Sequence, residues 1–120
     1  MSCKIFNLPD ISFIGGTYKE FIYEVEHADT LERINIENAT CVLTIKSYTN
    51  RGSSPALVKN GAVYKEPDDE FAYRFRFIID SVDTINLDGK YFYQIDIVDE
   101  DGDTTVAQGL MFIRRNINRN

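Results

Sequence analysis

The chain has 120 residues, 43% of them hydrophobic and 27% charged, which is enough apolar material for one compact core and a single domain, 1–120. Its 8 Phe and 7 Tyr exclude an intrinsically disordered chain. The formal net charge of -6 repels nucleic-acid phosphates and anionic lipid headgroups, so neither nucleic acid nor a membrane surface is an expected partner.

The first half of the chain alternates apolar and polar residues with a period of two, which is typical of β-strands. A weak strand signal at residues 11–14 ends at the turn sequence Gly15-Gly16. A clear strand follows at residues 20–26, and another covers residues 41–46. Their apolar phases are Phe21, Tyr23 and Val25 in the first, and Cys41, Leu43 and Ile45 in the second.

The second half continues the same pattern. Residues 57–64 lie between Pro55 and Pro67, which predicts an edge strand because proline cannot donate to a sheet ladder. Strong alternation follows at residues 71–80 and 91–98, with weaker strands at 84–87 and 105–113. Their strongest apolar phases are Phe71, Tyr73, Phe75, Phe77 and Ile79, and then Tyr91, Tyr93, Ile95 and Ile97.

About eight short strands without a capped helical stripe predict an all-β fold. One sheet alone would leave its apolar phase in water, and no helix is available to cover it, so a second sheet must pack against the first. We therefore expect an Ig-like antiparallel two-sheet sandwich of about 7–9 short strands. The absence of Trp, and of a Cys pair with inter-sheet spacing, argues against a true antibody-type domain.

The sequence offers little for catalysis. A Ser or Cys nucleophile needs a nearby base, and the single imidazole, His27, is expected to be a polar strand-end residue. Cys3 and Cys41 lack the spacing of a redox or metal motif and are interpreted as free thiols. No phosphate-binding loop, signal peptide or membrane span is recognised, so the expectation is a non-enzymatic protein without cofactors, made in the cytoplasm.

An acidic run at residues 99–103 is the one candidate cation site. Asp99, Asp101 and Asp103 could together offer oxygen ligands to Ca²⁺. Their spacing does not match an EF-hand loop, and Asp-Gly between two alternating strands is a strong hairpin signal. A solvated turn is the favoured interpretation.

Two sets of residues are candidate interaction surfaces. Tyr48, Tyr64 and Phe92 lie off the strongest apolar phases and could form a stacking platform for a sugar or a peptide, although packing under loops is the commoner role of such residues. The last strand is apolar on both phases. Either Leu110 and Phe112 or Met111 and Ile113 should face outward and form a self-association or docking surface.

Residues 89–99, the Asp101-Gly102 turn and Gly109 before the last apolar strand resemble the C-terminal half of small Ig-like sandwich proteins of tailed bacteriophages. The likeness is in particular to the N-terminal domain of the baseplate upper protein family. Residues 13–17 resemble that family's opening turn, and residues 39–46 resemble its next strand.

The resemblance implies a phage or prophage virion-associated module, in a tail, baseplate or head accessory role. Its partners would be other virion structural proteins or further copies of itself. Gly16 replaces the family's usual acidic residue, and residues 114–119 lack its proline and long continuation, so the expected role is a small companion protein. The alternative from another class is a carbohydrate-binding module, and a small hydrolase using His27 or the 99–103 carboxylates is the weakest reading.

Overall fold

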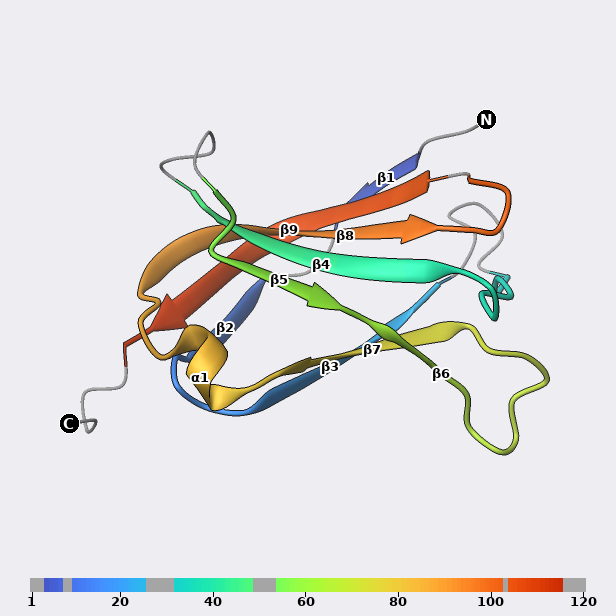
Figure 1. The fold of residues 1–120 in the computed structure, drawn as a ribbon, viewed down its shortest axis with the longest axis horizontal. Coiled ribbons are helices and arrows are strands. Elements are labelled where there is room, and N and C mark those ends of the chain that lie inside the picture. The colour runs from blue at the N-terminus through green and yellow to red at the C-terminus, as the bar shows by residue number, and fades with distance from the viewer. Residues whose placement is uncertain (1–3, 8–9, 26–31, 49–53, 103, 116–120) are drawn as a thin grey trace.

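The computed structural model describes residues 4–7, 10–25, 32–48, 54–102 and 104–115. Nearly all regular structure in them is β, arranged as two packed sheets (Figure 1), which confirms the predicted all-β sandwich. The elements are β1 (Lys4–Asn7), β2 (Ile11–Ile14), β3 (Lys19–Glu24), β4 (Thr40–Ser47), β5 (Leu57–Asn60), β6 (Ala62–Tyr64), β7 (Arg74–Ile79), α1 (Ser81–Thr84), β8 (Gly89–Val98) and β9 (Thr104–Arg114).

The larger sheet has six strands in the order β1-β9-β8-β4-β5, with β2 also paired to β9, and the smaller sheet has the order β3-β7-β6. All pairs are antiparallel except two: β1 and β2 both run parallel to β9. The alternation pattern did not predict β1 or these parallel pairs, because a period of two is the same in either orientation. As a result β9 lies inside its sheet, hydrogen-bonded on both sides.

The core lies between the sheets and is built from the alternating phases identified in the sequence. Phe75, Ile79 and Ile45 are fully buried, and Phe77 is almost so. The exception is at the start of the predicted strand 71–80, because β7 begins only at Arg74, and Ala72, predicted to face outward, is 2% exposed. In the other long strands, the residues predicted to face the core are the more buried ones.

The predicted edge segment 57–64 is two strands in two different sheets. β5 pairs with β4 in the larger sheet, β6 pairs with β7 in the smaller one, and only Gly61 separates them. Gly61 N donates to Cys41 O at 2.8 Å, and a Cβ at this position would lie 2.8 Å from Cε1 of Phe77. Glycine is therefore needed where the chain crosses between sheets. Both β5 and β6 are edge strands, as the flanking prolines predicted.

The predicted strand at residues 84–87 is wrong. Residues 81–84 form the one-turn helix α1, which begins after Asp80, whose N–H donates to Asp83 Oδ2 at 2.8 Å. Asp83 also accepts from Lys59 Nζ at 2.7 Å, and the buried Thr84 hydroxyl accepts from Gly16 N at 2.9 Å. These polar contacts, one within the turn and two to distant parts of the chain, outweigh the β preference of the Thr and Ile side chains in this segment.

Candidate functional site

The outer face of the larger sheet carries a set of aromatic and aliphatic side chains that three adjacent strands bring together. In the register of β4, β8 and β9, Lys46 stands beside Phe92, and Phe92 beside Leu110. The next row places Lys90 beside Phe112, and Tyr48 N donates to Lys90 O at 3.1 Å. We call the group Tyr48, Lys90, Phe92, Leu110 and Phe112 the aromatic patch.

Ring contacts hold the aromatic patch together. The rings of Tyr48 and Phe92 are stacked, with centroids 4.7 Å apart and an interplanar angle of 24°. Lys90 Nζ lies 3.8 Å from the centroid of Tyr48 and 5.9 Å from that of Phe112, so one ammonium contacts two rings. Tyr48 is 36% exposed, and the other three large apolar side chains are half-buried. No strand or helix within the described ranges covers this face.

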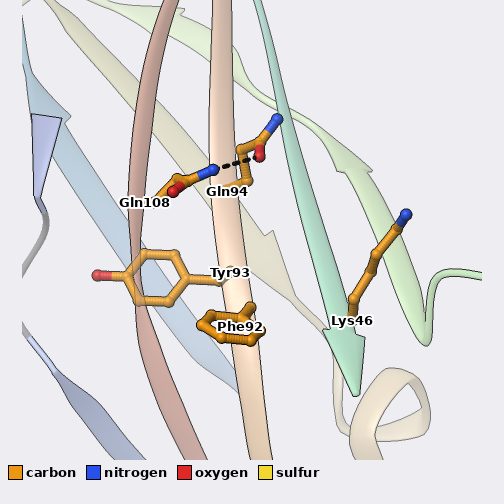
Figure 2. Close-up of a pocket in the computed structure, with 5 residues that line it drawn as sticks. All are labelled: Lys46, Phe92, Tyr93, Gln94 and Gln108. Atoms are coloured by element: carbon orange, nitrogen blue, oxygen red, sulfur yellow. Dashed lines mark hydrogen bonds between the residues drawn. The ribbon is translucent and has the colours of Figure 1, made fainter. Parts of the chain in front are cut away.

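A polar row borders the aromatic patch. Gln108 Nε2 donates to Gln94 Oε1 at 2.9 Å, and Gln94 Nε2 donates to Asp96 Oδ1 at 2.8 Å. Figure 2 shows the two glutamines joined by this bond beside Phe92 and Lys46. The surface is hollowed here in two places, of about 210 and 350 Å³. Gln94 and the Phe92 ring line both hollows, so apolar and hydrogen-bonding groups are available to the same ligand.

The structure divides the predicted last-strand surface by phase. Met111 is fully buried and Ile113 is 1% exposed, so both belong to the core. Leu110 and Phe112 occupy the opposite phase, on the outer face, where they join the aromatic patch. Of the two alternatives left open by the sequence, the first is the one observed.

The predicted aromatic platform is also divided. Tyr48 and Phe92 meet on the larger sheet, but Tyr64 lies on β6 of the smaller sheet, paired with Arg74. The hydroxyl of Tyr64 donates to Glu66 Oε1 at 3.3 Å, and the guanidinium of Arg76 lies 6.0 Å from its ring centroid. Tyr64 therefore belongs to the charged outer face of the smaller sheet, on the opposite side of the sandwich.

The sequence did not identify Lys46, Lys90, Gln94 or Gln108 as site residues. Each is an ordinary polar residue on the outward phase of its strand, and nothing in the local sequence sets it apart. The missing information was the register of β4 against β8 and of β8 against β9. Strand register brings these four side chains to the rings, and a single sequence specifies it only through the pattern as a whole.

Residues 99–102 of the acidic run lie in the turn between β8 and β9, as the hairpin signal predicted. Gly102 N donates to Asp99 O at 3.0 Å, and Asp101 N donates to Asp99 Oδ1 at 2.9 Å. Asp103 lies outside the described residues, as do His27 and Cys3. Among the described residues, no group of three or more His, Cys, Asp or Glu side chains is placed to hold a metal ion.

Cys41 is a core residue of β4 and is 2% exposed. Burial, assisted by the charge of Asp96, raises the pKa of its thiol well above the usual range. The thiol therefore stays protonated at neutral pH, and a protonated, buried thiol is neither a nucleophile nor a metal ligand.

Comparison with known proteins gives structural neighbours only. No protein-family model and no curated protein matches the chain. Similar solved structures include murine CRIg (TM-score 0.42, 6% identity, 89% of this chain and 92% of that one) and the Ig1 domain of mouse SynCAM 2 (0.40, 9%, 90% and 93%). A third is the 2,6-sialyltransferase of Photobacterium sp. JT-ISH-224 (0.38, 12%), where 94% of this chain matches 18% of that one. The two-sheet β-sandwich follows from the strands of this chain itself, and at these identities and TM-scores the likeness carries no argument about function.

In the ranges described, no helix has the length and apolar character needed to cross a membrane.

Proposed function

We propose that this chain is a non-enzymatic docking module that binds another protein through the outer face of its larger sheet. The observation that supports this is the aromatic patch, in which the ammonium of Lys90 lies over the rings of Tyr48 and Phe112 and the ring of Phe92 stacks on Tyr48. Aromatic side chains are enriched at the centres of protein interfaces and contribute much of the binding energy there. A sheet face carrying such a cluster suits a protein surface better than a small substrate.

The charge of the patch indicates the chemistry of the partner. The chain as a whole carries a formal charge of -6, but the charged side chains among the rings are Lys46 and Lys90. A partner with an apolar centre and carboxylates at its rim would be complementary to this face. The glutamine row at its edge supplies further hydrogen bonds.

The biological setting we propose is a phage or prophage particle, with other virion proteins or further copies of the chain as partners. This part rests on the resemblance of residues 13–17, 39–46 and 89–99 to phage sandwich proteins. Residues 89–99 include the whole of β8, the strand that contributes Lys90, Phe92 and Gln94 to the face. A strand that carries part of the resemblance is thus also the centre of the proposed interface.

The test is binding of the purified protein to purified tail and head assemblies of the phage or prophage that carries the gene, measured by biolayer interferometry. Phe92→Ala and Phe112→Ala should each weaken the Kd at least tenfold, because truncating a central interface residue costs about 2 kcal/mol or more. Val82→Ala, at a position on α1 that is 71% exposed, is the matched control and should have no effect. Equal binding by all four proteins, or none by the parent, would refute the proposal.

A carbohydrate-binding function is the second candidate, favoured by the two hollows beside Phe92 and the hydrogen-bonded row Gln108, Gln94 and Asp96. An aromatic ring with a few converging polar groups is a common ligand-site composition. An NMR titration with bacterial cell-wall oligosaccharides separates the two candidates. A sugar site should lose affinity in Gln94→Ala as much as in Phe92→Ala, whereas a protein interface should depend mainly on Phe92 and Phe112.

A further inference from the structure

The two sheets differ in width, and the larger sheet extends beyond the smaller one on one side of the sandwich. The larger sheet follows the path β1-β9-β8-β4-β5, and the smaller has only β3, β7 and β6. At about 4.8 Å per strand, the larger sheet is wider by roughly 10 Å. The β5–β6 side is closed by the crossing at Gly61. The excess therefore lies toward β2 and β3, the opposite side of the molecule.

An apolar groove of about 230 Å³ opens between β2 and β3. Its walls include Ile11 of β2 with Phe21 and Tyr23 of β3, and its floor includes Tyr93, Ile95 and Met111 from the core. Ile22, which also lines it, is 48% exposed. An apolar cavity of roughly 150 Å³ is enough to bind benzene, so this groove is large enough for an aliphatic or aromatic side chain.

The backbone of β3 is available beside the groove. Val25 N donates to Tyr73 O at 2.8 Å, and since antiparallel strands alternate, the odd-numbered residues of β3 bond to β7. The N–H and C=O groups of Glu20, Ile22 and Glu24 therefore point away from β7. Among the described strands, β3 has no other neighbour. Just beyond β3, the C=O of Val25 accepts from Ile34 N at 3.0 Å.

The side chains on the outer face of β3 determine which strand could pair there. Glu20 and Glu24 flank Ile22 and contribute Oε2 to contacts with Arg76 at 3.9 Å and Arg74 at 3.2 Å. A second copy of β3, paired about a two-fold axis through Ile22, would place Glu20 opposite Glu24 of the other copy at two positions. Like charges directly opposite one another destabilise a sheet, which disfavours self-pairing.

We propose that the free edge of β3 and the adjacent groove bind an extended strand of another protein. On one phase, this strand carries lysine or arginine opposite Glu20 and Glu24, with an apolar residue between them. On the other phase, it carries apolar side chains that enter the groove. Main-chain hydrogen bonds would supply affinity and the two phases would supply specificity. The site is separate from the aromatic patch and does not depend on the function proposed for it.

The probe is a capped, fluorescently labelled peptide whose central residues read Lys-Leu-Ile-Leu-Lys, with a Glu-Leu-Ile-Leu-Glu peptide as the charge control. Fluorescence anisotropy with the full chain should show tighter binding of the lysine peptide by at least tenfold. The Glu20→Lys and Glu24→Lys double variant should reverse the preference. Absence of binding by both peptides, or equal binding of both, would overturn the proposal.

Proline substitution tests the backbone part. Ile22→Pro removes an N–H that points to the free edge and keeps the ladder to β7, so it should reduce peptide affinity at least tenfold without unfolding the protein. Val63→Pro is the matched control. Ala62 and Tyr64 pair with even-numbered residues of β7, so the N–H of Val63 points outward from β6, at the other edge of the same sheet. It should leave peptide binding unchanged.

Other occupants give different results. If the parent dimerises in sedimentation experiments and Ile22→Pro makes it monomeric, a second copy fills the edge and the proposal is wrong. If Ile22→Pro binds the lysine peptide as well as the parent does, the contact is made by side chains alone and strand pairing is excluded. Phe92→Ala should not change peptide binding, so failure here and failure of the docking function can be told apart.

Discussion

Gly109 on β9 lies directly opposite Tyr93 on β8, and the phenol ring occupies the space where a side chain at position 109 would begin. A Cβ there would lie 2.7 Å from Cε1 of Tyr93. The ring cannot move aside cheaply because Tyr93 is only 3% exposed. Burial also raises the pKa of Tyr93 to about 12, so its hydroxyl stays protonated in the physiological range.

Gly109→Ala should therefore destabilise the protein by about 1–3 kcal/mol, the usual cost of overpacking a core. Chemical denaturation with tyrosine fluorescence measures this. Gln108→Ala, one residue earlier on the outward phase, is the control and should cost less than about 1 kcal/mol. A Gly109→Ala variant as stable as the parent would mean that the ring and strand are not packed in this way.

The loss of stability on substitution to alanine should depend on whether the strand residue faces the core or the solvent. Phe75 is fully buried, and Phe75→Ala should cost about 3–5 kcal/mol, whereas Gln94→Ala on an outward phase should be tolerated. Arg74 is also on an outward phase, but its Nη1 lies 2.6 Å from Asp69 Oδ2 and its Nε lies 3.2 Å from Glu24 Oε2. Arg74→Ala should give a denaturant midpoint between the other two.

Stability should fall in acid because of Asp69 and Asp83. The backbone N–H of Glu66, with the Arg74 guanidinium, holds the pKa of Asp69 below its ordinary value of 3.8. Burial opposes ionisation of Asp83, but the contacts with Lys59 and with the backbone N–H of Asp80 together outweigh it, and the pKa of Asp83 is also lowered. Groups with a lowered folded-state pKa stabilise the fold above the unfolded-state value, and this contribution is lost as pH falls through the folded-state value.

Asp69→Asn should thus show a smaller loss of stability below about pH 4 than the parent, measured by urea denaturation at a series of pH values. Asp68→Asn, which removes a neighbouring exposed carboxylate, controls for net charge. If the parent and Asp69→Asn lose the same unfolding free energy as the pH falls below about 4, the contact of Asp69 with Arg74 and Glu66 does not persist in solution.

Cys41 should be unreactive in the folded protein because its thiol is buried and protonated. In a Cys3→Ser background, iodoacetamide at pH 8 should modify position 41 only in denaturant, as measured by mass spectrometry. Rapid modification under native conditions would require local opening of β4.

Millimolar Ca²⁺ should leave the melting temperature unchanged, because the turn of Asp99 and Asp101 is held by its own backbone contacts. A ligand that binds only the folded state must raise the melting temperature. A rise of several degrees that disappears in Asp101→Ala would show that the acidic run is a cation site after all.

Much of the fold could be predicted from the sequence because burial in a sheet imposes a period of two. The phases of Phe21, Cys41, Phe75 and Tyr93 were correct for this reason. What failed was the segment at 84–87, where capping by Asp80 and Asp83 outweighs strand preference. The pairing of β1 and β2 with β9 was also missed, since alternation does not specify a partner or its direction.

The candidate site was predicted only in parts. Apolar character on both phases of residues 110–113 identified the last strand as a surface candidate, and outward aromatic residues identified Tyr48 and Phe92. That these belong to one cluster depends on the register between β8 and its two neighbours. The sequence also grouped Tyr64 with them. Alternation shows whether a residue faces the core or the solvent, but it does not show which of the two outer faces carries an outward residue.

The single-residue link at Gly61 has a consequence for how the molecule comes apart. β5 and β6 are one continuous piece of backbone anchored in both sheets, by Val58 opposite Thr44 and by Val63 opposite Phe75. Neither sheet can separate from the other on its own, because moving one sheet would also displace an edge strand of the other. The amide protons of the two strands should therefore exchange with deuterium in the same opening event, with nearly equal protection, and the sandwich should unfold as one cooperative unit.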